Sequence, residues 1–524
     1  MVTFAQGDVA GWASLVDSQV DALAVPVAPA ADGDDDVQPR TGTADAAARY
    51  GIDLARLADS AGLDGAAGET YTFHLPRALV ARDPMPWEGL PERLVLVGVG
   101  TGSARDLRRA GAALARATTG LARVVTTVAS EPGRSAAEAA RSFVEGFLLG
   151  AYTSPTFGGA TSGSRPASSE AAPAAPELVL LGKHEELVAA TAVRATASAR
   201  ATWLVRDLAA TPSNVKNPQW VAERAADLSR ATGLRVTVLD GDALEAGGFG
   251  GILAVGSGSA TPPRLVTVGY EPSVERVTQA SQHVVVVGKG ITYDTGGLSI
   301  KPRESMLPMK TDMAGAAVAL ATVLAAAELG IGHRVTAVLA LAENAFGGAS
   351  YRPADVLRTY SGTTVEILNT DAEGRIVLAD ALAYADATLE PDILIDVATL
   401  TGAATVGLGR THAALFSEDG ALVEALEAAG EATGERVWRL PLVPEYRSVL
   451  DSSVADIRHV AADSSTGGGS ITAALFLQAF VGGRRWAHLD IAGAARSTAA
   501  AHEVPVGPTG FGARLLVRFL ESLD

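Results

Sequence analysis

Two carboxylates and an arginine lie close together in the segment NTDAEGR, residues 369–375. Asp371 and Glu373 are two positions apart, and in an extended segment side chains at positions i and i+2 point to the same side. We therefore expect both carboxylates to reach one point, with Gly374 letting the backbone turn before the next helix. A solvated turn with a surface salt bridge would use the same residue types, so other segments must decide between the two interpretations.

Two further segments place charged side chains among glycines. GKGITYDTGGLSIKP contains Lys289, Asp294 and Lys301, and MKTDMAGA contains Asp312. A phosphate-binding loop would need Ser or Thr after Lys289, whereas Gly290 follows, so that interpretation is rejected. Asp312 begins a predicted Ala-rich helix, where an aspartate is also a favoured N-cap. The N-cap role and a role in a site can coexist.

Together, three loops contribute four carboxylates to one predicted site: Asp294, Asp312, Asp371 and Glu373. Without counter-charge they would repel one another and their pKa values would rise. Two divalent cations would balance them, and a metal pair about 3.5–4 Å apart is a known hydrolytic arrangement. Lys301 and Arg375 would then be cations suited to a developing oxyanion. Spacing alone does not establish this convergence.

The composition of the chain excludes several classes of binding and catalytic site. The net charge of −17 disfavours a dominant nucleic-acid surface. The absence of cysteine excludes disulfides, a thiolate nucleophile and Cys-ligated zinc. The eight histidines form no HExxH motif and no close pair, so a metal site has to rely on carboxylates. The N-terminal sequence does not resemble a signal peptide and no apolar run reaches about 20 residues, which predicts a cytoplasmic protein without a membrane span.

Apolar strands alternate with helices in the second part of the chain. We predict strands at 283–288, 334–342, 365–368, 392–397 and 486–491, and helices at 312–329, 375–388 and 470–481. Continuous apolar strands of this kind favour a mostly parallel (mixed) sheet that helices cover on both faces. Ligands of such sheets lie at the carboxyl ends of the strands.

The first part of the chain also alternates, with strands predicted at 94–99 and 124–129 and a helix at 104–118. Its GxGxG sequence at 98–102 lacks dinucleotide-loop spacing and predicts a tight turn. The fold class is therefore α/β throughout. We predict an N-terminal α/β domain at 1–192, which includes a flexible Ser/Gly/Pro/Ala-rich segment at 153–177, and a catalytic domain at 193–524. An acidic run at 32–36 is expected to be a solvated loop.

The charged segments closely resemble the leucyl aminopeptidase family of dinuclear metallopeptidases (peptidase family M17, cytosol aminopeptidase). NTDAEGR is present intact, and the loop pattern GKGxxxDxGGxxxK and MKxDMxGA also match. Similarity continues, in order, through DVATLTGA, SVADIRH, ITAALFL, HLDIAG and TGFGARLL, so it covers about residues 200–516. Residues before this range resemble the family only in layout.

The resemblance implies a metal-dependent enzyme that removes N-terminal amino acids, with a leucine-type preference, through a water that bridges two metal ions (Mn²⁺ or Zn²⁺). One ion would be held by Lys289, Asp294, Asp312 and Glu373. The other would be held by Asp294, Glu373 and Asp371, whose main-chain carbonyl also binds. Lys289 would have to be neutral, and a nearby dication depresses a lysine pKa.

The resemblance also assigns substrate contacts. Lys301 would stabilise the tetrahedral intermediate, and Arg375 would hold a bicarbonate ion that acts as general base. Asp312 and a metal ion would bind the substrate's free α-amine. The pocket for the first side chain would be lined by Met309, Thr399 and Gly402, with the backbone of Leu400 also meeting the substrate. The family further implies a homohexamer.

Three features depart from the family pattern: Ala345-Phe346 after Glu343-Asn344, the glycine-rich segment 461–469, and the insertion at 153–177. None coincides with an expected ligand, so they bear on side-chain preference and assembly. Two alternatives stay open from the sequence: a non-catalytic or DNA-binding assembly, which the acidic charge disfavours, and another dinuclear hydrolase such as a phosphatase.

Overall fold

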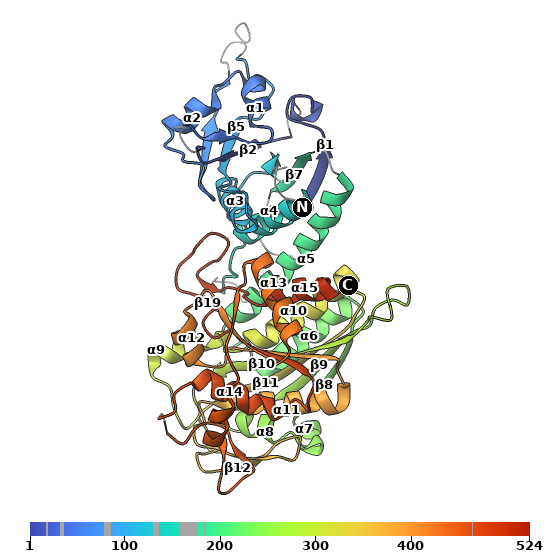
Figure 1. Cartoon of the computed structure of the whole chain (residues 1–524), viewed down its shortest axis with the longest axis vertical. Coiled ribbons are helices and arrows are strands. Elements are labelled where there is room, and N and C mark those ends of the chain that lie inside the picture. The colour runs from blue at the N-terminus through green and yellow to red at the C-terminus, as the bar shows by residue number, and fades with distance from the viewer. Residues whose placement is uncertain are drawn as a thin grey trace. The chain divides into compact units, whose positions relative to one another are not determined.

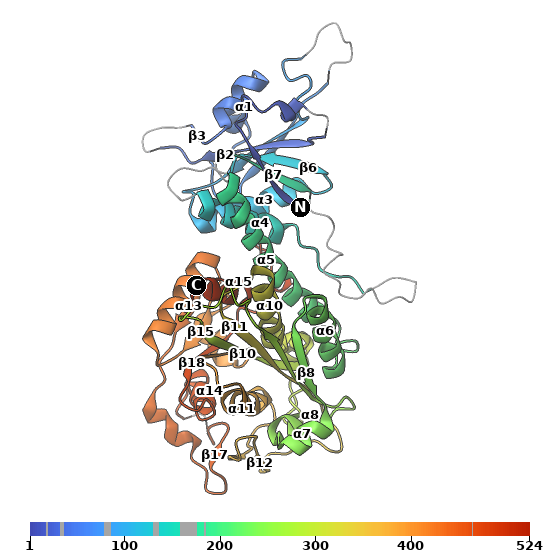
Figure 2. The ribbon, with the colours of Figure 1, turned by 90° about the vertical axis from the view of Figure 1, so that its right-hand side faces the viewer.

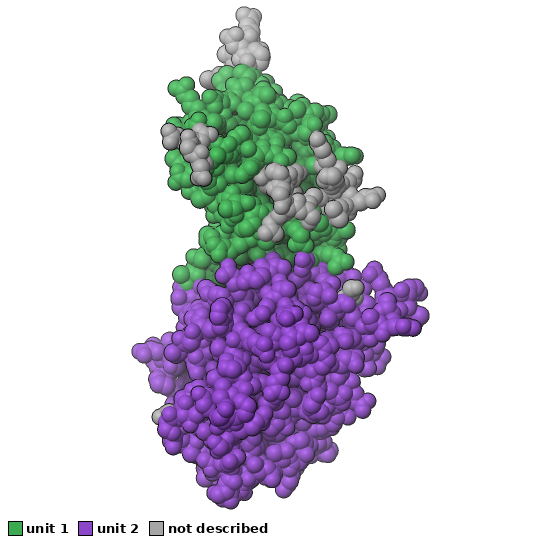
Figure 3. Space-filling model, viewed as in Figure 1, with its two compact units in different colours: residues 1–153, 168–200, 499–505 green, residues 154–167, 201–498, 506–524 purple. Residues whose placement is uncertain are grey.

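The computed structural model describes residues 1–16, 19–31, 36–77, 85–128, 136–157, 176–182, 185–463 and 465–523. Most of the Ser/Gly/Pro/Ala-rich segment and of the acidic run at 32–36 lies outside these residues. The chain forms two compact units, one of Met1–Thr153, Ser168–Arg200 and Ala499–Pro505, the other of Ser154–Ala167, Ala201–Thr498 and Val506–Asp524 (Figure 3). The predicted boundary at 192/193 lies within helix α5 (Glu185–Ala210) and stays a prediction.

The first unit contains a seven-stranded sheet with helices packed on it (Figure 2). Its order is β1 (Val2–Gln6), β7 (Glu177–Gly182), β6 (Arg123–Thr126), β2 (Ala22–Ala28), β5 (Arg93–Gly98) and β4 (Thr70–His74), with β3 (Gln38–Pro39) paired to β2. Its helices include α1 (Thr43–Tyr50), α2 (Leu54–Ser60), α3 (Ala104–Ala117) and α4 (Ala136–Gly150). The predicted tight turn is present: Gly100 and Gly102 have φ of 54° and 73°, and Ser103 caps α3.

The second unit is built on an eight-stranded mixed sheet. Its order is β16 (Val437–Arg439), β15 (Ala413–Phe416), β18 (Arg485–Asp490), β14 (Ile393–Ala398), β10 (His283–Asp294), β11 (Arg334–Asn344), β9 (Arg264–Tyr270) and β8 (Arg235–Leu239). The four strands from β18 to β11 are parallel, and β15, β9 and β8 join antiparallel to their inner neighbours. This arrangement confirms the predicted α/β class.

Helices cover both faces of this sheet (Figure 1). On one face lie α6 (Pro218–Ala231), α10 (Ala314–Leu329), α13 (Gly420–Thr433) and α15 (Ala513–Leu523). On the other lie α7 (Gly241–Gly247), α8 (Gly250–Gly256), α11 (Glu373–Tyr384) and α14 (Gly469–Gln478). Alternate residues of β10 enter the two cores, Val284 on the first face and Val285 on the second. Two buried cores explain why the strands are apolar on both sides.

Small residues let α10 approach the sheet closely. A β-carbon on Gly315 would lie 2.0 Å from the carbonyl oxygen of Val397, and one on Gly288 would lie 2.4 Å from the Cα of Ala316. Among the described residues, one helical stretch, Arg303–Leu329, is long and apolar enough to cross a membrane, and 78% of its apolar window is buried within the fold. Such burial is typical of a core helix.

Two local expectations were wrong: that the strand at 365–368 belongs to the main sheet, and that Asp312 is the N-cap of the following helix. The strand predicted at 365–368 is β13 (Thr364–Glu366), which pairs with β12 (Val356–Arg358) and β17 (Ile457–Arg458) in a separate three-stranded sheet. An apolar run predicts a strand but not its partner. Asp312 is not the N-cap of α10: the N-cap is Met313, and Asp312 follows the short 3-10 helix η3 (Leu307–Thr311).

Candidate metal and substrate site

The charged segments meet at one side of the central sheet of the second unit. Lys289 lies on β10 and Asp294 ends that strand, whereas Glu373 begins α11. A single cavity of about 600 Å³ has in its lining all eleven residues that the sequence assigned to the site. These are Lys289, Asp294, Lys301, Met309, Asp312, Asp371, Glu373, Arg375, Thr399, Leu400 and Gly402. The eleven residues therefore line one cavity, while the role of each residue stays a prediction.

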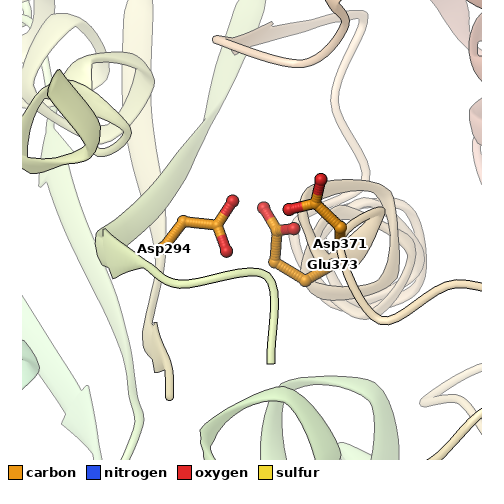
Figure 4. A group of neighbouring side chains, drawn as sticks. All are labelled: Asp294, Asp371 and Glu373. Atoms are coloured by element: carbon orange, nitrogen blue, oxygen red, sulfur yellow. The ribbon is translucent and has the colours of Figure 1, made fainter. Parts of the chain in front are cut away.

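Three carboxylates face one another within this cavity. Asp294 points from the end of β10 toward Asp371, which lies in the turn before α11, and toward Glu373, which begins that helix (Figure 4). One oxygen of each lies within 4.8 Å of the others. Within the described part of the chain, this is the one group of three or more His, Cys, Asp or Glu side chains close enough to share a metal ion.

The backbone that brings Asp371 and Glu373 together is a turn, not the extended segment that we expected. The side chain of Asn369 accepts a hydrogen bond from the Asp371 N–H at 2.9 Å, and its carbonyl accepts one from the Ala372 N–H at 3.2 Å. Helix α11 then begins at Glu373. The two carboxylates converge because the chain curls into the helix, so the alternation argument was wrong although the convergence was correct.

Two lysines act as counter-ions for these carboxylates. The Nζ of Lys289 lies 2.9 Å from Asp312 Oδ2 and 2.9 Å from Glu373 Oε1. The Nζ of Lys301 lies 2.8 Å from Asp294 Oδ2 and also pairs with Asp371. Each ammonium group is thus shared between two carboxylates.

Burial, together with the close spacing of the charges, shifts the pKa values of these groups. Burial, reinforced by the neighbouring carboxylate of Asp294, raises the pKa of Glu373 to about 8 and that of Asp312 to about 6. Burial also raises the pKa of Asp371. Burial acts to lower the pKa of Lys289, but the Asp312 and Glu373 carboxylates outweigh it and raise that pKa above its ordinary value. Such shifts are those expected of carboxylates that lack sufficient cationic charge.

Hydrogen bonds fix the orientation of the carboxylates. Asn344 donates from Nδ2 to Asp294 Oδ1 at 2.8 Å and to the carbonyl of Thr370 at 3.0 Å. The hydroxyl of Thr399 donates to Asp312 Oδ1 at 2.7 Å. Sequence analysis did not assign a role to Asn344. It lies directly opposite Asp294 where β11 and β10 end side by side, and that shared position was the signal available.

The donor set fits a divalent metal ion. Glu373 is 1% exposed, and its Oε2 has no hydrogen-bond partner. A buried polar atom without a partner is rare and costly, so an additional ligand at this point would satisfy it. Carboxylate oxygens are the ligands that Mg²⁺ and Mn²⁺ prefer, and Zn²⁺ accepts them as well. The described residues can therefore hold one or more divalent cations.

Arg375 lies in the first turn of α11 and is 7% exposed. Its Nη1 donates to the carbonyl of His459 at 2.8 Å, and its Nε has no hydrogen-bond partner. Burial lowers the pKa of Arg375 to about 10, against the opposing effect of the Glu373 carboxylate. Arg375 is thus a buried cation with donor capacity left over at the cavity wall.

Clustered carboxylates, two lysines and a buried arginine on an α/β scaffold define the site of a metal-dependent hydrolase. The comparisons with known proteins specify the class further. The chain belongs to the cytosol aminopeptidase family: the catalytic domain of that family matches residues 203–517, and its N-terminal domain matches residues 25–157. The family inferred from the sequence motifs is confirmed, and the match to the N-terminal domain extends it beyond layout alone.

Several relatives cover nearly the whole chain. Probable cytosol aminopeptidases of Streptomyces avermitilis and Streptomyces coelicolor are each 41% identical over 96% of this chain and 96% of their own length. The probable cytosol aminopeptidase of Desulfovibrio desulfuricans is 48% identical over 66% of this chain and 69% of its own. A solved structure, the bottromycin maturation enzyme BotP, is 35% identical with a TM-score of 0.79 and covers 96% of this chain and 99% of BotP; a structure of BotP in complex with Mn is equally similar. Family membership makes this chain a metal-dependent aminopeptidase that acts on peptides.

Proposed function

We propose that the chain hydrolyses the first peptide bond of peptides with a free N-terminus and prefers a leucine-type first residue. Two divalent cations, Mn²⁺ or Zn²⁺, are held as the family resemblance assigns them. Lys289, Asp294, Asp312 and Glu373 hold one ion. Asp294, Asp371 and Glu373 hold the other. When bound, such a metal pair supplies an activated water at neutral pH and polarises the scissile carbonyl.

The two lysines have different roles in this proposal. Lys289 would be a neutral ligand, because a dication at Asp312 and Glu373 would offset the carboxylate charge that raises its pKa. Lys301 pairs with Asp294 and Asp371, and bound cations would offset those carboxylates and leave its ammonium group available. Its ammonium group then donates to the oxyanion that develops on the substrate carbonyl.

Arg375 and Asp312 complete the assignment. Arg375 would hold a bicarbonate ion with its unpaired donors, and such an ion would supply a proton acceptor for the attacking water. Asp312 accepts a hydrogen bond from the substrate's α-amine, which explains why an internal peptide bond is not cleaved. Met309, Thr399 and Gly402 line the pocket for the first side chain, and the backbone of Leu400 contacts the substrate; all four lie in the cavity lining.

The observation that carries the proposal is the buried, unpartnered Oε2 of Glu373 within the carboxylate cluster. The test is to strip metal with EDTA, titrate with Mn²⁺ or Zn²⁺, and follow release of ammonia from leucine amide. We expect metal-restored activity that N-acetylation of the substrate abolishes. Activity on N-acetyl-leucine amide, or none on any free-amine substrate at saturating metal, would contradict the proposal.

Assembly and location complete the proposed function. We propose a homohexamer in the cytoplasm, as the family resemblance implies. Light scattering at micromolar concentration should give about six times the chain mass of 53.4 kDa, and a monomer mass would contradict it.

A further inference from the structure

Two arginines that have no assigned role line the same cavity as the carboxylates. Arg410 is exposed and Arg496 is half-buried. Neither guanidinium makes a hydrogen bond or an ion pair with any residue that the structure describes. The other cavity cations differ, since Lys289 and Lys301 each contact two carboxylates and Arg375 donates to a carbonyl.

The backbone holds the two arginines on one wall. Arg410 follows α12 (Gly402–Leu408), and Arg496 begins the short strand β19 (Arg496–Ser497), which comes after β18. These segments touch where a β-carbon on Gly493 would lie 2.1 Å from the carbonyl oxygen of Gly409. The two backbone segments can approach so closely only because position 493 is a glycine. Arg410 and Arg496, which follow Gly409 and Gly493, are therefore held near the same part of the cavity.

The two arginines are also close enough for the charge of one to affect the pKa of the other. Burial lowers the pKa of Arg496, and the positive charge of Arg410 lowers it further. Glu304 is an acidic residue in the same lining, but it forms no ion pair with either guanidinium. Two adjacent cations without an anionic partner are the arrangement of an anion-binding site, because each guanidinium can bind a carboxylate through two parallel hydrogen bonds.

The cavity lining therefore carries both a cluster of carboxylates and a pair of arginines. The proposed amine-binding group Asp312 shares Lys289 with Glu373, and Arg410 and Arg496 add positive charge to the same lining. A volume of about 600 Å³ is in the range of small-ligand sites. Consecutive Cα atoms of a peptide are about 3.8 Å apart, so a dipeptide places its amine and its carboxylate within one such cavity.

We propose that Arg410 and Arg496 form a subsite for a substrate carboxylate located just beyond the scissile bond. The proposal rests on the proposed aminopeptidase function and specifies its substrate class: short peptides whose terminal carboxylate reaches the arginines, or peptides with an acidic second residue. Both sources offer the same group, and substrates that differ in only one of them distinguish the sources.

The first measurement uses the unmodified protein. Its kcat/KM is compared for leucylglycine and leucylglycine amide, and for the amides of leucyl-aspartic acid and leucyl-asparagine. We expect roughly a tenfold preference for the charged member of at least one pair, because hydrogen bonds to charged groups are among the stronger ones. The effect should lie mainly in KM, since the contact is present in both the bound substrate and the transition state.

The variants Arg410→Gln and Arg496→Gln should bring that ratio close to one. Arg352→Gln is the matched control, because Arg352 is an exposed arginine of the same unit outside the cavity lining. A preference confined to the first pair identifies the peptide terminus, and one confined to the second identifies an acidic side chain. Equal rates within both pairs in the unmodified protein, or a preference that survives both substitutions, would overturn the subsite. Failure to cleave any of the four substrates would instead contradict the proposed function.

Discussion

The side chain of Lys289 lies directly against Gly374. A β-carbon at position 374 would sit 2.5 Å from Lys289 Cε and 2.7 Å from its Nζ. Gly374 is helical within α11 and does not have a positive φ. The glycine is therefore required for space and not, as the sequence suggested, to let the backbone turn. It leaves room for the one amine that contacts both Asp312 and Glu373.

Substitution Gly374→Ala should displace Lys289 and weaken metal binding. We expect Mn²⁺ affinity to fall by about 10- to 100-fold, the range found when groups that support metal ligands are altered. The fold should survive, because alanine favours a helix over glycine by about 1 kcal/mol. Calorimetric titration with Mn²⁺ measures the affinity. Gly420→Ala is the control, since a β-carbon there has no neighbour within 4 Å, and an unchanged affinity in G374A would refute the steric role.

Glu373→Gln should abolish stabilisation by metal. A ligand present at 100 times its Kd stabilises a folded protein by about 2.7 kcal/mol, so Mn²⁺ should raise the Tm of the unmodified protein. Burial and the neighbouring Asp294 carboxylate raise the pKa of Glu373, so its negative charge is disfavoured at this site when no cation is added. Glutamine should therefore leave the metal-free Tm nearly unchanged. Differential scanning calorimetry with and without Mn²⁺ measures both, and a full Mn²⁺ shift in E373Q would contradict its assignment as a ligand.

Lys301→Met should separate catalysis from metal binding. We expect kcat to fall by about 10² to 10³, as when a donor to an oxyanion is removed. Metal affinity should be kept or increased, because the substitution frees Asp294 and Asp371 from their ammonium partner. Steady-state kinetics at saturating Mn²⁺, together with a calorimetric titration, measure both quantities. A parallel loss of affinity and kcat would instead make Lys301 part of the metal-binding set.

The pattern of apolar residues predicted the strands of the fold better than it predicted which strands pair with one another. The run around Val365 predicts a strand, but nothing within the run specifies its neighbours, which are the nearby Leu357 and the distant Ile457. The strands β10 and β14 were predictable, because side chains buried on both faces leave a continuous apolar sequence. Long-range pairing is decided by tertiary packing, which a single sequence does not display.

The candidate site was predictable for a different reason. Charged residues in apolar surroundings mark it, and the motif match grouped them. The local backbone was not predictable, as Asp371 shows: its turn depends on a hydrogen bond to the Asn369 side chain, which competes with an extended conformation. Asn344 was missed because its role depends on its register opposite Asp294 across two strands that lie fifty residues apart.

Asp380 anchors the helix that carries Glu373 and Arg375. It is fully buried, and its two oxygens accept hydrogen bonds from the N–H groups of Ile252 and Tyr360, both at 2.8 Å. Asp380→Asn turns an amide NH₂ toward one of these donors and leaves it unpaired, so we expect a loss of about 1–3 kcal/mol in unfolding free energy. Urea unfolding measures it. Asp227→Asn, at an exposed ion pair, should change stability by under about 1 kcal/mol, and equal effects would refute the anchoring role.

His283 should make the protein sensitive to acid. It begins β10, where its Nε2 contacts the Thr336 hydroxyl at 2.9 Å, and burial together with Arg334 lowers its pKa to about 4. The ordinary pKa of histidine is about 6.5, so between these values the unfolded chain binds more protons than the folded one. Stability from His283 is therefore present above pH 6.5 and is lost as the pH falls toward 4.

The His283→Gln variant tests this dependence. Between pH 7.5 and pH 5, the unmodified protein should lose about 1–2 kcal/mol more unfolding free energy than the variant, after allowance for partial solvent screening. Urea unfolding of EDTA-treated protein at both pH values removes any contribution from metal release. His412→Gln is the control, because His412 lies outside the buried core and should leave the pH dependence unchanged. If the unfolding free energies of H283Q and of the unmodified protein changed equally with pH, His283 would have the same pKa in the folded and the unfolded protein, which would contradict the prediction.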